Sequence, residues 1–185
     1  DDRDVRPNRI FSGDEIKRLV AAVTAKGGGL ASEKRKQSKQ NPPLMFDLTS
    51  LQRESNRRFG MSAKRALDAA QRLYERHKAT TYPRTDSRYL PDDYEATVRG
   101  ILDNLALGGD VSATAQKIIA QGPLNLAKVL DSTKVSDHFA IIPTGTIPVE
   151  LSGDDVKVYD LVVRQFLAAL MGPATFATVE RIVEV

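Results

Sequence analysis

The chain has 185 residues, with 27 lysines and arginines against 24 aspartates and glutamates, which gives a net charge of +3 and a pI of about 9.2. This length forms one domain of ordinary size, or one domain and a piece of a second. The sequence has no cysteine, which excludes disulfides and any cysteine-ligated zinc site within it. No apolar run approaches a membrane span and no signal peptide pattern is present, so we expect a cytoplasmic protein with no membrane partner.

The first part of the chain is predicted to combine β structure with one helix. Residues 5–11 fit a short strand or a loop, and Ser12 with Glu15 forms a capping box at a helix start. The glycines at 27–29 end that helix. Residues 30–35 fit a strand that leads into a basic, polar linker. The apolar face of the helix consists of Ile16, Leu19, Val20 and Val23.

A run of helices is predicted next. Thr49 and Gln52 offer a second capping box, and Gly60 is expected to terminate the helix that follows it. Ser62 is the expected N-cap of the next helix. The apolar positions of these two helices are Leu48, Leu51, Phe59, Ala63, Ala66, Leu67, Ala70, Leu73 and Tyr74.

The second half of the chain continues this helical pattern around irregular stretches. Residues 91–105 and 112–120 fit two helices, and residues 131–149 contain prolines that prevent a long one. Ser152 is expected to cap the last helix, which ends at the Gly-Pro pair of residues 172–173. The apolar stripe of this last helix is Val156, Tyr159, Val162, Val163, Phe166, Leu167 and Leu170.

The layout predicts a mainly α fold in which a helical domain interrupts a second, incomplete domain that contains β strands. The prolines at 42–43 mark the first boundary, and the end of the chain is rich in β-branched residues typical of a strand. We therefore expect residues 1–41 to belong to the β-containing domain, residues 42–172 to form the helical domain, and residues 173–185 to be the return strand. The opening letters DDRDVRPNRIF do not resemble a natural start, so we expect a fragment of a longer protein.

Basic residues gather in two runs. Each charge taken alone is typical of a solvated helix surface, but arginine outnumbers lysine in the second run, and guanidinium groups match phosphate oxygens. This favours a phosphate-binding surface. The runs are Lys34, Arg35, Lys36 and Lys39, followed by Arg53, Arg57, Arg58, Lys64, Arg65, Arg72 and Arg76.

The stretch TTYPRTDSRYL at residues 80–90 lacks helical periodicity and is predicted to be an extended loop. Tyr82 and Arg84 are two residues apart, so in an extended segment their side chains point to the same side, and Pro83 stiffens the backbone between them. A phenol is a poor nucleophile at neutral pH, but a neighbouring cation favours its ionised form and can neutralise charge on a reacting phosphate. On spacing alone, Tyr-Pro-Arg in a loop is more often a simple turn.

Several segments in order resemble the type IA DNA topoisomerases, and within them the topoisomerase III branch. The loop at residues 80–90 resembles the active-site tyrosine motif of that family. The resemblance extends from about residue 10 onward, which makes it specific. The other segments that carry it are PPLMFDLTSLQ at 42–52, FGMSAKR at 59–65, AQRLYE at 70–75, KVSDHFAIIPT at 134–144 and YDLVVRQFLA at 159–168.

The resemblance implies a role for each matching residue. Tyr82 would attack a phosphodiester of single-stranded DNA and keep the 5′ phosphate as a covalent ester, so that no ATP is required. Arg84 would hold the scissile phosphate, and His138 would be a hydrogen-bonding or proton-relay partner there. The residues that resemble DNA-contacting or loop-positioning sites are Gln71, Glu75, Thr81, Thr85 and Asp86.

His138 has an alternative interpretation, since it precedes an apolar Phe-Ala-Ile-Ile run and would equally fit a buried structural histidine. The family match favours the site. Many relatives carry a second histidine where this chain has Phe139, so any role of that imidazole is absent here. Tyr74 and Tyr89 are interpreted as packing residues, and His77 as a surface residue near a helix end.

The resemblance also implies a part that this sequence lacks. The family completes its active site with an acidic Toprim domain that binds magnesium, and no such acidic cluster occurs here. The pairs Asp92-Asp93 and Asp154-Asp155 are interpreted as charges that favour helix starts, so no metal site is expected in this chain. Magnesium and the Toprim domain would belong to the longer parent.

Two functions from different classes follow. The first is an enzyme, a DNA topoisomerase that passes one strand through a transient break in another, in the cytoplasm and associated with the nucleoid. The second is a non-catalytic module that binds single-stranded DNA. An acidic Toprim-like sequence before Asp1 would identify the parent as the enzyme.

Overall fold

The computed structural model describes residue 10, residues 12–151 and residues 153–184. The chain forms two compact units. One, here called the ribbon unit, combines Asp1–Gln40 with Thr175–Val185, and the other, here called the helical unit, is Asn41–Ala174. Each unit is described separately.

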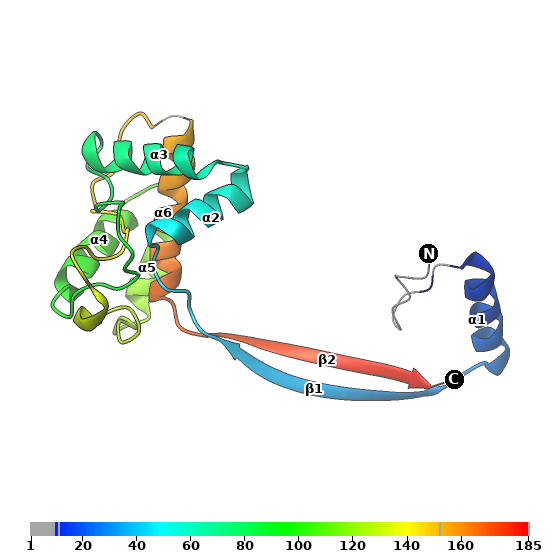
Figure 1. The fold of residues 1–185 in the computed structure, drawn as a ribbon. Helices are drawn as coiled ribbons and strands as arrows, with labels where there is room; N and C mark the ends of the chain where they lie inside the picture. Colours follow the sequence, from blue (N-terminus) through cyan, green and yellow to red (C-terminus); the bar gives the residue numbers. More distant parts are fainter. Residues whose placement is uncertain (1–9, 11, 152, 185) are drawn as a thin grey trace. The chain divides into compact units, whose positions relative to one another are not determined.

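The described residues of the ribbon unit form one helix and a two-stranded sheet (Figure 1). The helix is α1 (Gly13–Lys26), and the strands are β1 (Leu30–Gln40) and β2 (Ala174–Glu184). The Ser12 hydroxyl accepts a hydrogen bond from the Glu15 amide at 3.4 Å, and Gly27 adopts a left-handed conformation with φ of 66°. Both helix boundaries were predicted correctly. The prediction for residues 5–11 lies outside the described residues, apart from Ile10.

Strand β1 is longer than predicted, because the expected basic linker continues the strand to Gln40. Its partner is β2, which runs antiparallel to it (Figure 1). The Ser32 hydroxyl donates to the Ile182 carbonyl at 3.5 Å, and Arg181 forms an ion pair with Glu33 at 2.7 Å. Backbone pairing with a strand from the far end of the chain therefore overrides the polar composition of this segment.

The ribbon unit leaves its apolar side chains exposed. None of the described residues of α1, β1 or β2 is buried. In a soluble protein, apolar faces on a helix and a ribbon are normally covered by another layer. The large apolar side chains exposed on these three elements are Ile16, Leu19, Val20, Val23, Leu30, Phe176, Val179, Ile182 and Val183.

The helical unit is built around its longest helix, α6, which packs against α2, α3 and α5 (Figure 1). Helices α4 and α5 pack on each other. Long loops connect these helices, and they contain the segments at residues 80–90 and 134–144 that resemble family motifs. The helices are α2 (Leu48–Phe59), α3 (Ala63–Glu75), α4 (Glu95–Ala106), α5 (Ser112–Ala120), η1 (Ser132–Lys134, a 3-10 turn) and α6 (Asp154–Leu170).

The predicted start of α2 was wrong by two residues. The capping box is formed by Asp47 and Ser50: the Ser50 amide donates to the Asp47 carboxylate at 2.6 Å, and the Asp47 amide donates to the Ser50 hydroxyl at 3.1 Å. Thr49 lies inside the helix. An aspartate caps as well as a threonine does, so both registers fit the sequence. Gly60, with φ of 62°, ends α2, and Ser62 caps α3, both as predicted.

The first turn of α6 also connects this helix to α3. The predicted cap, Ser152, lies outside the described residues, and Gly153 precedes the first turn. Asp154 and Asp155 occupy that turn and form ion pairs across to α3, with Arg65 at 2.8 Å and Arg72 at 2.6 Å. These acids therefore tie two helices together, in addition to favouring the helix dipole.

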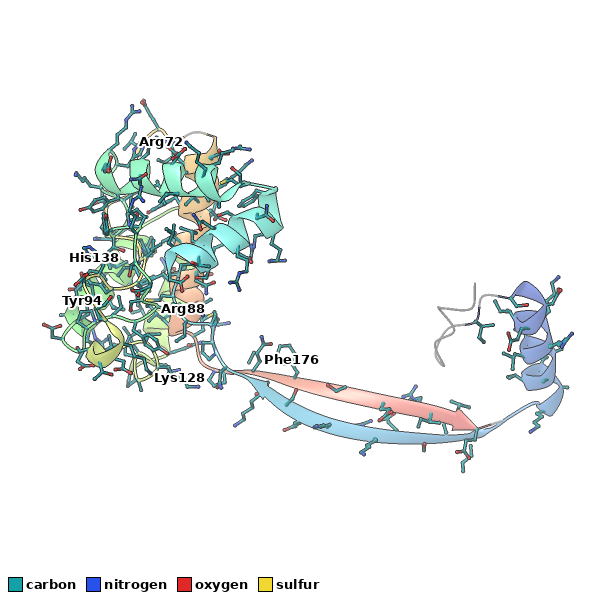
Figure 2. All side chains as sticks on the ribbon, viewed as in Figure 1. Arg72, Arg88, Tyr94, Lys128, His138 and Phe176 are labelled. Carbon is teal, nitrogen blue, oxygen red and sulfur yellow. The ribbon has the colours of Figure 1, made fainter. Side chains whose placement is uncertain are left out.

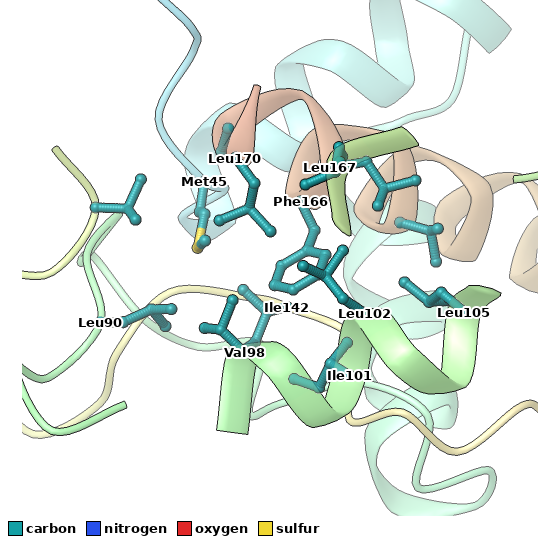
Figure 3. Packing of buried hydrophobic residues seen from close by; sticks show 14 of the residues in the cluster. Met45, Leu90, Val98, Ile101, Leu102, Leu105, Ile142, Phe166, Leu167 and Leu170 are labelled. Carbon is teal, nitrogen blue, oxygen red and sulfur yellow. The ribbon is translucent and has the colours of Figure 1, made fainter. Parts of the chain in front are cut away.

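Two clusters of buried side chains form the core, one along the second half of α6 and one along its first half. Figure 3 shows the larger one, in which Phe166 of α6 lies among side chains of α4 and the loops. The smaller one packs α2 and α3 against α6, with Leu51 and Leu73 fully buried. Tyr159 touches both clusters. Three residues predicted to face the core, Phe59, Ala63 and Val156, are exposed.

The helices across the described part of the chain are all too short or too polar to cross a lipid bilayer.

Candidate active site

The loop at residues 80–90 is extended, as predicted, and is tied to distant parts of the helical unit by isolated backbone bridges. Thr80 pairs with Pro143, and Leu90 pairs with Leu130. The Leu90 amide donates to the Val129 carbonyl at 2.8 Å. The loop therefore lies along residues 129–143 and is held at both ends.

Thr81, predicted to line the motif, anchors the loop beside Tyr82. Its amide donates to the Ile142 carbonyl at 2.9 Å. Its hydroxyl donates to the Ala140 carbonyl and accepts from the Ile142 amide, both at 2.9 Å. The backbone next to Tyr82 is thus fixed from both sides, so Thr81 positions the loop.

Thr85 has a similar role on the other side of Tyr82. It is buried, its hydroxyl donates to the His138 carbonyl at 2.9 Å, and its own carbonyl accepts from the Leu48 amide at 3.0 Å. Asp86 is exposed and accepts from the Ser136 hydroxyl at 3.1 Å. These bonds place His138 directly across from the Tyr82 loop.

Two aromatic rings flank Tyr82. The His138 ring lies 4.3 Å from the Tyr82 ring between centroids, tilted by 46°, and the Tyr74 ring lies 5.4 Å away, edge to face at 78°. Within the described residues, no hydrogen bond or ion pair engages the Tyr82 hydroxyl or the His138 imidazole. The structure therefore brings Tyr82 and His138 together and leaves their polar atoms unpaired.

The arginines of the loop have different surroundings. Arg84 is exposed and, among the described residues, has neither an ion pair nor a hydrogen-bond acceptor. Arg88, labelled in Figure 2 with His138, donates from Nε to the Met45 carbonyl at 2.9 Å and is half-buried. Arg84 is therefore free to meet an anion, whereas Arg88 fastens the loop to the start of the helical unit.

A left-handed residue turns the chain from α3 into the loop. Lys78 has φ of 53°, which costs a non-glycine residue conformational energy. The Thr144 hydroxyl donates to the Lys78 carbonyl at 2.6 Å, and the Ala79 amide donates to the Leu73 carbonyl at 2.9 Å. This turn sets the direction in which the chain approaches Tyr82.

Comparisons with known proteins identify the family of this chain. A family model described as DNA topoisomerase matches residues 2–185. The chain belongs to the DNA topoisomerase family. The family resemblance predicted from the sequence motifs is thereby confirmed.

Individual relatives give the extent of the match. DNA topoisomerase 3 of Bacillus subtilis (strain 168) is 37% identical over 186 residues, which cover 100% of this chain and 25% of that protein. DNA topoisomerase 3 of Shouchella clausii is 41% identical over 178 residues, covering 94% of this chain and 24% of that protein. A full-length topoisomerase I from Thermotoga maritima shares the fold, with a TM-score of 0.64 at 21% identity, over 97% of this chain and 29% of that one. The chain spans about a quarter of the length of the curated relatives it matches.

The basic residues of this topoisomerase-family chain fall into two groups, those that form an ion pair with a carboxylate and those that do not. Most of the arginine-rich run on α2 and α3 already has carboxylate partners: Arg57 and Arg58 pair with Glu54, Lys64 with Asp68, Arg65 with Asp154 and Arg72 with Asp155. The sequence did not reveal these pairings. Among the described residues of the same run, Arg53 and Arg76 have no carboxylate partner, and neither do Lys78 and Arg84 beyond it. Arg76, Lys78 and Arg84, which lie close to Tyr82 in the chain, are therefore among the described cations that have no carboxylate partner.

The predicted helix residues Gln71 and Glu75 lie on α3 near its end. Gln71 is half-buried and Glu75 is exposed. Within the described part of the chain, neither side chain has a hydrogen-bond or ion-pair partner. They are available to a ligand, but among the described residues no hydrogen bond or ion pair joins them to Tyr82, Arg84 or His138.

The described residues do not fit a magnesium site. The described residues contain no group of three or more histidine, cysteine, aspartate or glutamate side chains arranged to hold a metal ion. Asp154 and Asp155 are committed to arginines, and the Asp92 carboxylate accepts from the Ser132 amide at 3.3 Å.

Two residues gained importance only in the structure. His77, predicted to be a surface residue, is half-buried, with Nε2 3.8 Å from the Asp155 carboxylate. Tyr74, predicted to be a packing residue, contacts the Tyr82 ring. The position of Tyr74 in the sequence could have indicated this contact. An aromatic residue in the last turn of a helix lies close to the segment that follows the helix, which here is the loop with Tyr82.

Proposed function

We propose that this chain is the tyrosine-bearing part of a longer type IA DNA topoisomerase that changes DNA topology by passing one strand through a transient break in another. The observation that carries the proposal is the pairing of Tyr82 with His138 beside a free Arg84, in a chain of the DNA topoisomerase family. Isomerisation of this kind conserves the phosphodiester energy in a covalent ester and needs no ATP.

In the proposed reaction, the Tyr82 phenolic oxygen attacks a DNA phosphorus, and the bond from that phosphorus to the 3′ oxygen breaks. The phenolic proton leaves as the new ester forms, and the departing 3′ oxygen gains a proton. A phosphotyrosine at the 5′ end and a free 3′ hydroxyl result. Religation is the same step in reverse, with the 3′ hydroxyl attacking and Tyr82 leaving.

Arg84 and His138 are assigned complementary parts of this step. The free guanidinium of Arg84 would contact the scissile phosphate and neutralise charge as the phosphorus becomes five-coordinate. The His138 imidazole, unpaired and 4.3 Å from the Tyr82 ring between centroids, would donate to or relay a proton at the same phosphate. Gln71, Glu75 and Asp86 would contact DNA near the cleavage point.

We also propose that the helical unit is an insertion in a β-containing arch domain, with boundaries at about residues 41 and 173. The pairing of β1 with β2 supports this, because these strands precede and follow the helical unit in the sequence. The exposed apolar side chains of the ribbon unit support an incomplete domain whose remaining parts lie elsewhere in the parent.

Magnesium is assigned to another part of the parent. An acidic Toprim domain of the same polypeptide would hold it, because this chain offers no fitting cluster among the described residues. DNA, mainly single-stranded, is the proposed substrate, and the cytoplasm with its nucleoid is the proposed location.

The rival function is a non-catalytic module that binds single-stranded DNA. Residues 1–185 alone should behave in this way, because they bring the nucleophile without the acidic partner domain. We expect weak binding to single-stranded DNA that falls steeply as salt rises, and no covalent adduct with or without magnesium. An adduct formed by this chain alone would show that it is self-sufficient.

The deciding experiment traps the covalent intermediate in the full-length protein. Wild type, Tyr82→Phe and the control Tyr89→Phe are mixed with labelled single-stranded DNA and magnesium, then denatured. The proposal expects an adduct from wild type and from Tyr89→Phe, and none from Tyr82→Phe, because only the phenolic oxygen can form the ester. A normal yield from Tyr82→Phe would remove Tyr82 as the nucleophile, and no adduct from wild type would favour the rival.

A further inference from the structure

The Tyr82 side chain is held by aromatic contacts. The bonds of Thr81 fix the backbone beside it, but the χ1 torsion of Tyr82 still decides where the phenolic oxygen lies, and χ2 sets the plane of the ring. Since no polar group in the described residues engages the Tyr82 hydroxyl, the orientation of the ring depends on its neighbours. Those neighbours are His138 on one side and Tyr74 on another.

The position of Tyr74 is fixed by the packing of helix α3. It lies in the last turn of α3, next to Leu73, which is fully buried. The bidentate contact of Arg72 with Asp155 joins this end of α3 to α6. The Lys78 ammonium lies 5.7 Å from the centroid of the Tyr74 ring, within the range of a cation–π contact. The Tyr74 ring is therefore fixed by the helix below it and covered by a cation.

The two ring contacts differ in what holds them. His138 belongs to a loop and, under the proposed function, moves protons at the phosphate. Tyr74 belongs to a helix, and its edge-to-face contact at 5.4 Å and 78° has the geometry that aromatic pairs prefer. A helix-borne ring is the better reference point for a nucleophile that must be placed closely.

We propose that Tyr74 is a positioning residue, which holds the Tyr82 ring so that its phenolic oxygen meets the scissile phosphorus. This inference rests on the proposed role of Tyr82 as the nucleophile. Tyr74 needs its ring for this purpose and not its hydroxyl. The Lys78 ammonium would keep the Tyr74 ring in place.

The size of the effect follows from the value of orientation in catalysis. A misplacement of about 1 Å in a reacting group can cost about 100-fold in rate. Loss of an edge-to-face aromatic pair of this kind lowers the fraction of correctly placed rings by up to about tenfold. We therefore expect removal of the Tyr74 ring to slow DNA cleavage by about tenfold or more, with little change in DNA affinity.

The test compares Tyr74→Leu, Tyr74→Met and Tyr74→Phe in the full-length protein. Single-turnover formation of the covalent adduct on labelled single-stranded DNA gives the rate, and titration of the same DNA gives the dissociation constant. Leu and Met are both expected to cleave about tenfold more slowly, while Phe keeps the wild-type rate. Using two ring-free variants keeps the test valid if one of them fails to fold, which circular dichroism would reveal.

Phe59→Leu is the matched control. Phe59 is an aromatic residue on α2 with Lys157 5.5 Å from its ring centroid, a similar contact with a lysine, but no ring contact joins it to Tyr82. This variant should cleave at the wild-type rate. If Tyr74→Leu and Tyr74→Met also cleave at that rate, the inference is wrong.

Two further outcomes would overturn it. A rate loss in Tyr74→Phe equal to that in Tyr74→Leu would assign the effect to the hydroxyl. A weakening of DNA binding that matches the rate loss would make Tyr74 a DNA contact. The Tyr82→Phe experiment separates these results from a failure of the proposed function, because it tests the nucleophile without changing Tyr74.

Discussion

The ion pair between Arg72 and Asp155 gives a sharp test of what holds the helical unit together. Arg72 of α3 contacts both carboxylate oxygens of Asp155 with Nε at 3.1 Å, and its Nη2 reaches Oδ1 at 2.6 Å. Asp155 is only 8% exposed. The hydrogen bond with Asp155 raises the pKa of Arg72 further above its already high value. Asp155→Asn keeps the shape of the side chain and removes its charge.

The expected loss can be estimated from the exposure of each partner. Removing one member of a fully buried ion pair costs about 3–5 kcal/mol. The Arg72 side chain is 46% exposed, so water can solvate the abandoned guanidinium and lower that cost. Asparagine also favours the α6 N-terminus less than aspartate does. We expect Asp155→Asn to lower the free energy of unfolding by about 2 kcal/mol.

Urea denaturation followed by circular dichroism at pH 7 measures this loss. Asp160→Asn is the matched control, because Asp160 lies on the same helix and pairs with Arg164 at 2.7 Å, with both side chains largely exposed. That change should cost less than about 0.5 kcal/mol. If Asp155→Asn and Asp160→Asn have the same effect, the tertiary pair contributes no more than a surface pair. A double-mutant cycle with Arg72→Met isolates the coupling between Arg72 and Asp155.

Three further predictions concern acid stability, a buried hydroxyl and the loop arginine. Hydrogen bonds from Arg57 and then Arg58 lower the pKa of Glu54 from 4.5 to about 2. Its stabilising effect is therefore complete above about pH 4.5 and is lost as the pH falls toward about 2. Glu54→Gln should flatten the acid denaturation profile in that window, and an unchanged profile would contradict the assignment. Thr80→Val should raise the free energy of unfolding by about 1 kcal/mol, because the buried Thr80 hydroxyl has no hydrogen-bond partner. A loss of stability in urea denaturation would mean that this hydroxyl is satisfied. In the full-length protein, Arg84→Ala should slow single-turnover cleavage by about 100-fold while weakening DNA binding only modestly. Equal losses in rate and affinity would make Arg84 a binding residue only.

The features that the sequence predicted are those determined by neighbouring residues. Ser12 and Ser62 cap their helices, and Gly27 and Gly60 end theirs, because capping depends on a side chain within three residues or on a left-handed turn. The extended loop around Tyr82 was predicted for the same reason. At the start of α2, Asp47 and Thr49 both have side chains that can cap a helix, and local chemistry did not distinguish them.

The features that escaped prediction depend on residues far apart in the chain. The extension of β1 to Gln40 depends on its pairing with residues 174–184, which no local pattern in a basic segment reveals. The carboxylate partners of Arg65 and Arg72 lie 89 and 83 residues away, so a run that resembled a free basic surface is largely neutralised. The contact of Tyr74 with Tyr82 likewise needs the turn at Lys78 to be known.

The anchoring of Thr81 has a consequence for how the loop moves. The loop has no regular secondary structure, yet its amides at Thr81 and Leu90 donate to the carbonyls of Ile142 and Val129. Those amides should exchange with deuterium as slowly as the amides of a paired strand, since exchange requires local unfolding. Any displacement of Tyr82 must carry residues 138–142 with it or first break these bonds. While these bonds persist, we expect Tyr82 and His138 to move together, so that their relative geometry is kept when the surrounding helices rearrange.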